Sequence, residues 1–130
     1  MRASAFVVAA AIVVVSAASV VRAHHSYAEF DVERTVTIHG TIENILFANP
    51  HVVLKVRAGD ATLYTATWNA ARQLTRQGVS ATRLNVGDAV VVIGSPSKIS
   101  AEVSKLVEVS RPSDRWAWRM KPFGAVEVTP

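Results

Sequence analysis

Apolar and polar residues follow four different patterns along this chain. Residues 5–21 are apolar except for Ser16 and Ser19, and residues 24–34 are polar without a sustained period. Residues 35–110 contain short runs in which apolar and polar positions alternate, and residues 111–130 mix aromatic with basic side chains. Because neighbouring side chains of a strand point to opposite faces, alternation predicts half-buried strands. The chain should therefore consist of an apolar leader, a polar arm, a β-rich body and a basic, aromatic tail.

The body is predicted to contain five strands and one short helix. Turn-forming residues separate the alternating runs. Asn69 is a candidate N-cap of the helix, and Gly78 is suited to end it. The expected strands are Thr35–Phe47, His51–Arg57, Ala61–Trp68, Ala89–Ile93 (closed by Gly94) and Glu102–Ser110, and the expected helix is Ala70–Gln77.

The first two strands are predicted to form a hairpin around Ala48-Asn49-Pro50. Pairing Phe47 with His51 across this turn would place Glu43 opposite Lys55. Opposite charges that face each other across two strands stabilise a sheet by about 0.2–1 kcal/mol. The predicted register is therefore consistent with the charges of both strands.

The order strand, strand, strand, helix, strand, strand is that of the OB-fold, a small five-stranded barrel. Gly40 lies inside the long first strand, where a glycine commonly marks a bulge or a sharp bend. A small β-sandwich is the alternative, since element order alone does not prove closure. We expect an OB-like barrel domain at residues 35–110, preceded by an arm at 24–34 and followed by a tail at 111–130.

The leader has the three parts of a secretory signal peptide. Met1-Arg2 provides a positive start, the apolar run follows, and Val21-x-Ala23 places small residues at a cleavage site. The alternative is an uncleaved membrane anchor, but the run would cover about 25 Å of a hydrocarbon core of roughly 30 Å. We therefore expect cleavage after Ala23, a periplasmic or secreted protein, and no transmembrane span in the mature chain.

Composition narrows the classes of partner and chemistry. The chain has no cysteine, which excludes disulfides, thiolate catalysis and cysteine-based metal sites. Loss of Arg2 and Arg22 with the leader would reduce the 14 basic residues to 12 against 10 acidic ones, a net charge of +2. This weak charge and an extracytoplasmic address argue against nucleic acid as a partner. The mature chain is long enough for one compact domain.

Short motifs occur in a characteristic order along the mature chain. They are Ala23-His24-His25-Ser26-Tyr27, Phe30-Asp31, Gly40-Thr41, Asn49-Pro50-His51 and Gly87-Asp88. Together they resemble a family of small secreted bacterial proteins of unknown function, whose mature regions typically start with AHHSF or AHHSY. The resemblance extends to about Val109 and implies an envelope location and a β-barrel-like domain, but no reaction. The tryptophan-rich tail departs from the pattern of that family.

Cleavage after Ala23 would create a candidate metal site at His24 and His25. The free α-amine and imidazole of His24 could bind a metal together, as in the histidine brace of several exported copper proteins. Nitrogen ligands suit Cu(II), Ni(II) or Zn(II), and Cu(II) stands highest in the affinity order. Because the amine must lose its proton, binding should strengthen between about pH 6 and pH 8. The alternative is a polar leader without a ligand.

His51 is the third candidate metal ligand. It follows Asn49 and Pro50, which are residues typical of turns, so His51 could simply begin a strand. In the functional interpretation His51 lies at the barrel mouth, and the arm from His24 onwards folds back to complete a site there. An extended arm of this length could reach about 35 Å. His39 is predicted to be a surface strand residue, too far along the strand from His51 to share a metal.

The tail contains the other candidate binding residues, Arg115, Trp116, Trp118 and Arg119. Basic and aromatic side chains in alternation could stack on and pair with an anionic glycan, a lipid headgroup or a single-stranded nucleic acid. The alternative is that the tryptophans pack on the barrel while the arginines remain in solvent.

No catalytic constellation is evident in the sequence. Ser26 follows two histidines, but a nucleophile needs an oriented base and an oxyanion site. We therefore expect an exported, non-enzymatic binding domain whose physiological ligand is unknown, with Cu(II) the first candidate cofactor. The alternative is an envelope module that binds a glycan, a membrane surface or a protein partner through its tail.

Overall fold

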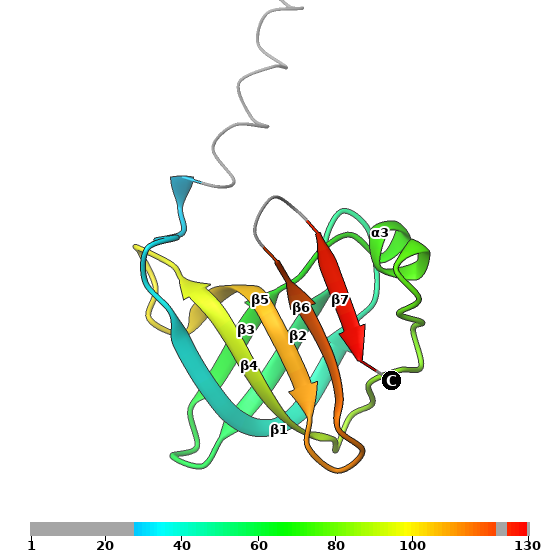
Figure 1. Ribbon diagram of the computed structural model, residues 1–130. Helices are drawn as coiled ribbons and strands as arrows, with labels where there is room; N and C mark the ends of the chain where they lie inside the picture. Colours follow the sequence, from blue (N-terminus) through cyan, green and yellow to red (C-terminus); the bar gives the residue numbers. More distant parts are fainter. Residues whose placement is uncertain (1–27, 122–124, 130) are drawn as a thin grey trace, which may run out of the picture.

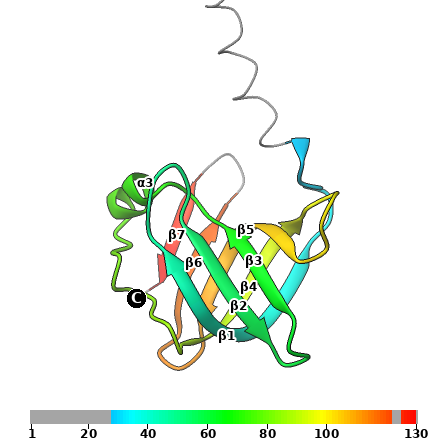
Figure 2. The same ribbon diagram turned by 180° about the vertical axis from the view of Figure 1, so that it is seen from behind.

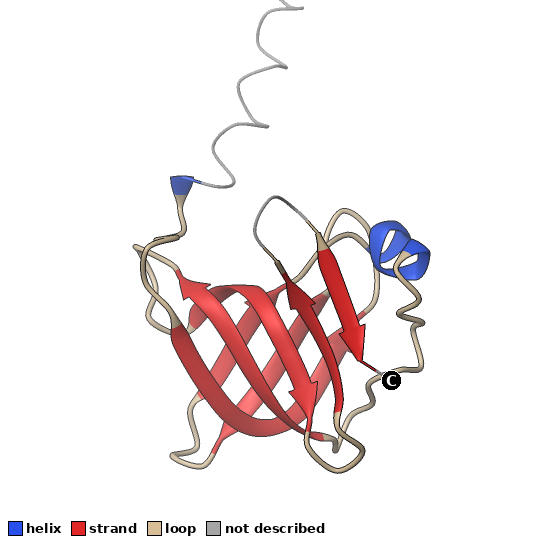
Figure 3. Ribbon diagram, in the orientation of Figure 1, coloured by secondary structure: helices blue, strands red, loops and turns tan. Residues whose placement is uncertain are grey.

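The computed structural model describes residues 28–121 and 125–129, which form a curved sheet and one short helix (Figures 1 and 3). The leader and the first residues of the arm lie outside this part. The elements, in chain order, are β1 (Val36–Leu46), β2 (Val53–Ala58), β3 (Leu63–Thr67), α3 (Ala71–Arg76), β4 (Ala89–Pro96), β5 (Val103–Arg111), β6 (Trp116–Met120) and β7 (Val126–Thr129).

Five strands close into a barrel in the order β3-β2-β1-β4-β5. Neighbouring strands in this order are antiparallel, and β3 closes the barrel by pairing in parallel with β5 through residues 65–67 and 103–105. Figure 2 shows β3 and β5 side by side at this closure. The predicted OB-like barrel with one short helix is thereby confirmed, and the sandwich alternative is wrong.

The long strand β1 pairs with two neighbouring strands. Its first half, from Val36 to Thr41, pairs with β4, and its second half, from Gly40 to Leu46, pairs with β2. Gly40 takes part in both pairings, and a Cβ atom placed there would lie 2.3 Å from the carbonyl oxygen of Arg57. The predicted bend is therefore correct: only a residue without a side chain allows β1 to curve so closely against β2.

The predicted register of the β1–β2 hairpin is wrong near the turn. A bulge at Glu43 shifts the pairing, so that Lys55 lies opposite Asn44. Glu43 instead accepts two hydrogen bonds, each of 2.7 Å, from Nε and Nη2 of Arg57. Because of this extra residue in β1, the Glu43 carboxylate binds Arg57 instead of facing Lys55.

Two further local predictions are corrected. Strand β4 does not end at Gly94 but continues to Pro96, because Gly94 is a point of close approach: a Cβ there would lie 2.7 Å from the carbonyl oxygen of Lys105. The N-cap position of α3 is Ala70 rather than Asn69, and no side chain of its own caps it. The Asn49 side chain accepts a hydrogen bond of 3.1 Å from the Arg72 amide instead. Gly78, with φ of 85°, follows the helix as expected.

The first part of the tail continues the sheet. Strand β5 pairs with β3 only near its beginning and takes β6 as its partner from Glu108 onwards, and β7 then adds to β6. Trp116 and Trp118 on β6 are fully buried. The Trp118 ring meets the Trp68 ring edge to face, with centroids 5.1 Å apart, so the tail completes the hydrophobic core. No helix within residues 28–121 and 125–129 is long and apolar enough to cross a membrane.

Candidate functional site

A pocket of about 250 Å³ lies at one end of the barrel, where four distant parts of the chain meet. We name it the mouth pocket and define it by residues 29–30, 50–51, 67–70, 73 and 105. These residues come from the arm, the β1–β2 turn, the segment that runs from the end of β3 into α3, and β5. In Figure 1 the arm and α3 lie at this same upper end of the barrel.

The arm is held against the end of β4 by a short network. The Asp31 amide donates to the Pro96 carbonyl at 2.9 Å, and the Lys98 amide donates to the Glu29 carbonyl at 2.8 Å. The Ser97 hydroxyl donates to the Glu29 carboxylate at 3.0 Å. These bonds place Glu29 and its neighbour Phe30 along one wall of the pocket.

The turn that carries His51 is also fixed. Its Asn49–Pro50 peptide bond is cis. Val52, which follows His51, donates through its amide to the Asn69 carbonyl at 3.0 Å and accepts through its carbonyl from the Trp68 amide at 2.7 Å. The turn is thus tied to the end of β3, and His51 lies exposed at the pocket.

Trp68 is the most buried of the large side chains that line the pocket, with 4% of its surface exposed. Its Nε1 atom is fully buried and has no hydrogen-bond partner among the described residues. By comparison, the Trp118 Nε1 donates to the Gln77 side chain at 3.1 Å. Leaving a buried N–H without an acceptor costs about 1–3 kcal/mol of stability.

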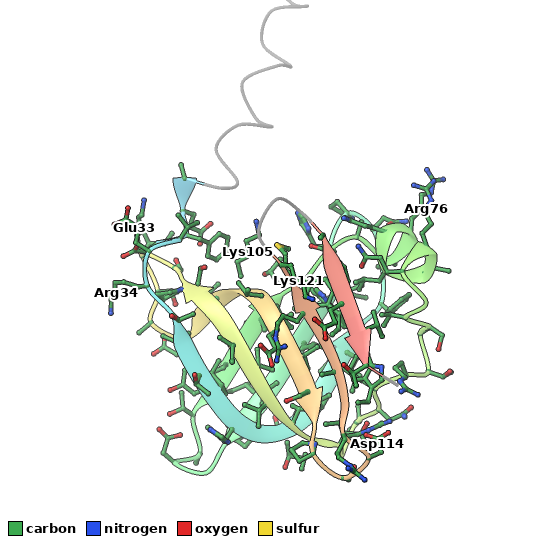
Figure 4. The ribbon with its side chains drawn as sticks, in the orientation of Figure 1. Glu33, Arg34, Arg76, Lys105, Asp114 and Lys121 are labelled. Carbon is green, nitrogen blue, oxygen red and sulfur yellow. The ribbon has the colours of Figure 1, made fainter. Side chains whose placement is uncertain are left out.

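Lys105 supplies a basic group beside Trp68. Its Cα pairs with that of Thr67 at the parallel junction of β3 and β5, directly before Trp68 in the chain. Figure 4 shows Lys105 toward the upper end of the barrel. The side chain is half-buried, and burial lowers its pKa because an ammonium group is less well solvated there. The pocket therefore brings a half-buried basic side chain together with aromatic and polar side chains.

The predicted metal ligands are placed only in part. His24 and His25 lie outside the described residues, while His51 lines the mouth pocket. His39 is exposed on β1 and lines a different, shallow groove. Within the described part of the chain, no group of three or more His, Cys, Asp or Glu side chains could hold a metal ion.

The candidate residues of the tail have separate environments. Trp116 and Trp118 are buried, as the alternative of packing on the barrel predicts. The Arg83 guanidinium lies 5.0 Å from the centroid of the Trp116 ring. Arg119 donates to Glu108 through Nε at 2.7 Å. Arg115 is exposed at the β5–β6 turn, with φ of 63°. No tryptophan face of β6 is open to a ligand in this arrangement.

Sequence reasoning missed Trp68 and Lys105 as site residues. Trp68 was expected only as the last residue of a strand, and Lys105 as an unremarked position in the final one. The signal for Lys105 was a change of phase in β5, whose buried positions shift from Ser104 and Leu106 to Val109. The pocket that Lys105 lines is decided only when β3 pairs with β5, which is a contact between distant segments.

Comparison with known proteins identifies the family but no activity. No curated protein matches the chain at a significant level. Residues 10–105, about three quarters of the sequence, match a family described as being of unknown function. The predicted resemblance to an uncharacterised family is confirmed at that level, whereas secretion and the N-terminal motif remain predictions. The chain is thus a member of the family of unknown function DUF6152.

Proposed function

We propose that this protein is an exported binding domain that holds a transition metal, copper first, at the mouth of its barrel. The proposed ligands are the α-amine and imidazole of His24, the imidazole of His25, and His51. This proposal includes removal of the leader after Ala23, because only that cleavage makes the His24 amine a ligand.

The observation that supports the proposal is the shared position of the arm and the β1–β2 turn. Glu29 and Phe30 line the same pocket as His51. Three residues separate His25 from Glu29, and the four steps between them span at most about 14 Å. The mature N-terminus therefore begins within reach of the pocket wall that carries His51.

The ligand set also fits copper chemically. An amine and neutral imidazoles are nitrogen donors, which suit Cu(II) better than the oxygen-preferring Mg²⁺ or Ca²⁺. The hydrogen bonds that fix the turn would hold His51 in place, while the chain end could adjust to the geometry of the metal.

The test has two parts, beginning with N-terminal sequencing of the exported protein, where His24 should be the first residue. Cu(II) is then titrated into the mature protein, and bound metal is measured by mass spectrometry. One tightly bound copper per chain is expected, with at least about tenfold weaker affinity after His51→Ala. An alanine added before His24 should abolish the tight site.

His39→Ala is the matched control, since it removes an exposed imidazole that lies in a different groove. Its copper affinity should equal that of the unmodified protein. Unchanged binding by the chain with the added alanine would reject the N-terminal chelate, and a first residue other than His24 would remove its chemical basis.

A further inference from the structure

An open groove of about 620 Å³ adjoins the mouth pocket along α3. We name it the arginine groove, and it is lined by Asn49, Ala70, Arg72, Gln73 and Arg76. Ala70 and Gln73 also line the mouth pocket, so the two sites are neighbours. We propose that the arginine groove binds a phosphate group, carried by a lipid headgroup or by a soluble compound, through the guanidinium groups of Arg72 and Arg76.

The first argument concerns the missing partners of the two arginines. Arg72 and Arg76 are exposed, and within the described part of the chain neither side chain has a hydrogen-bond or ion-pair partner. By contrast, Arg57, Arg111 and Arg119 each bind a carboxylate. Among the described residues that line the groove, none is acidic. The guanidinium groups in the groove are therefore available to an external anion.

The second argument concerns the helix that carries the two arginines. Strand-to-helix packing buries only Leu74 of α3, which is six residues long and contains no acidic residue. Like charges four residues apart on a helix repel each other and destabilise it. An anion held between Arg72 and Arg76 would replace this repulsion with attraction to both charges. The bound anion should therefore stabilise α3.

The third argument concerns geometry. Side chains four residues apart lie on the same face of a helix, with their Cβ atoms about 5–6 Å apart, so Arg72 and Arg76 can reach one ligand together. Figure 4 shows Arg76 extending outward from α3 at the upper end of the barrel. A single guanidinium can bind both oxygens of a carboxylate. A phosphate group offers further oxygens in a tetrahedral arrangement, so it can engage two guanidinium groups where a monocarboxylate engages one.

Asn49 adds a neutral donor to the same groove. Its Oδ1 atom accepts a hydrogen bond of 3.1 Å from the Arg72 amide, which ties the β1–β2 turn to the first turn of α3. Its Nδ2 atom has no partner among the described residues and can only donate. Two cations and a fixed amide donor form a set that suits an anion with several oxygens.

Inorganic phosphate is the first probe. The ¹⁵N-labelled protein is titrated with phosphate at neutral pH and constant ionic strength, with EDTA present to remove metals. The resonances of the Arg72 backbone amide and the Asn49 side-chain amide should shift and saturate, with a dissociation constant below about 10 mM. Acetate, which carries one carboxylate, should bind at least about tenfold more weakly.

Two double variants with the same loss of charge test the arginine pair. Arg72→Gln with Arg76→Gln keeps good helix formers and should weaken phosphate binding by about tenfold or more. Arg34→Gln with Arg115→Gln removes two exposed arginines outside the groove and should leave phosphate binding unchanged. If the first double variant does not fold, Arg76→Gln alone should weaken binding. Equal weakening in both double variants, or no saturation below about 10 mM phosphate in the unmodified protein, would overturn the proposal.

Vesicles distinguish the source of the phosphate group. The protein is sedimented with vesicles of phosphatidylcholine alone or mixed with phosphatidylglycerol. Sedimentation with the anionic vesicles that is lost in Arg72→Gln with Arg76→Gln would identify a lipid headgroup. Saturable binding of phosphate without such sedimentation would identify a soluble phosphate compound.

This inference is independent of the copper site, because the residues of the arginine groove include no histidine. His51→Ala should leave phosphate binding unchanged. Phosphate binding without copper uptake would retain the arginine groove and reject the chelate, and copper uptake without phosphate binding would do the reverse.

Discussion

Arg111 shows how one side chain can join segments that the sequence keeps apart. Its Nη1 atom donates to the Asp88 carboxylate at 2.7 Å and to the Arg83 carbonyl at 3.0 Å. Its Nε and Nη2 atoms bind both oxygens of Asp114 in the β5–β6 turn. Only 15% of the side chain is exposed, and Figure 4 shows Asp114 at the end of the barrel opposite Lys105. Arg111 thus joins the loop before β4 to the β5–β6 turn, at the end of the barrel opposite the mouth pocket.

The contacts between Arg111 and Asp114 predict that the fold loses stability at acidic pH. The hydrogen bonds from Arg111, and then that from the Trp116 amide, lower the pKa of Asp114 from its ordinary value of 3.8 to about 2. Because the folded-state pKa is the lower one, ionised Asp114 stabilises the fold above pH 3.8, and this contribution is lost as the pH falls toward 2. Urea unfolding at several values from pH 5 to pH 2 should therefore show a smaller loss of stability in Asp114→Asn than in the unmodified protein, since the other carboxylates with lowered pKa values remain in both. Parallel pH curves for the two proteins would contradict the role of Asp114.

At the scale of single elements, the curvature of β1 depends on the absence of a side chain at Gly40. Its two halves pair with different neighbours, and Gly40 lies where the pairings overlap. The strand is strongly curved in Figure 1, as a barrel of five strands requires. Alternation of apolar residues predicted the strand, but only the close approach of Arg57 explains why position 40 excludes even a methyl group.

Gly40→Ala should destabilise the fold by about 1–3 kcal/mol or more, because the added Cβ meets backbone atoms that cannot move aside as a side chain would. The free energy of unfolding in urea measures this effect. Gly59→Ala is the matched control, since a Cβ at Gly59 meets nothing within 4 Å, and its change should stay within about 0.5 kcal/mol. Equal stability of the two variants would show that β1 is not constrained at Gly40.

Errors in the predicted elements have a common physical cause. The bulge at Glu43 and the continuation of β4 past Gly94 are both responses to a neighbouring strand. The cap supplied by Asn49 to α3 comes from a turn more than twenty residues away. Local sequence patterns carry no information on such partners, so the strands were predicted closely and their register less well.

At the scale of the whole molecule, the C-terminal strands β6 and β7 extend the sheet of the closed barrel and complete its core. Strand β5 leaves β3 after Lys105, and β6 takes over as its neighbour and carries Trp116 and Trp118 into the core. The residues predicted as a tail thus contribute two of the largest buried side chains of the protein. The interpretation of these tryptophans as packing residues determines what their replacement should do.

Trp118→Ala should lower the free energy of unfolding by about 3–5 kcal/mol, because it removes a fully buried ring and its contact with Trp68. Trp118→Phe should cost less, since most of the volume remains. Ile99→Ala serves as the control, because 82% of Ile99 is exposed and its loss should change stability by no more than about 0.5 kcal/mol. A Trp118→Ala protein with unchanged stability and weaker binding to envelope fractions would favour the tail as an interaction surface.

The sequence by itself determined the class of fold, the order of the elements and the position of the bend, because alternation, turn residues and glycine act within a few residues of each other. It also predicted His51, which lines the mouth pocket, and the resemblance to an uncharacterised family. Tertiary structure decided which side chains share the mouth pocket and that the tail belongs to the core. Lys105 is brought next to the end of β3, and the arm next to the β1–β2 turn, only when the barrel closes. Such contacts join segments separated by tens of residues, and their stability depends on burial and packing that no local pattern contains.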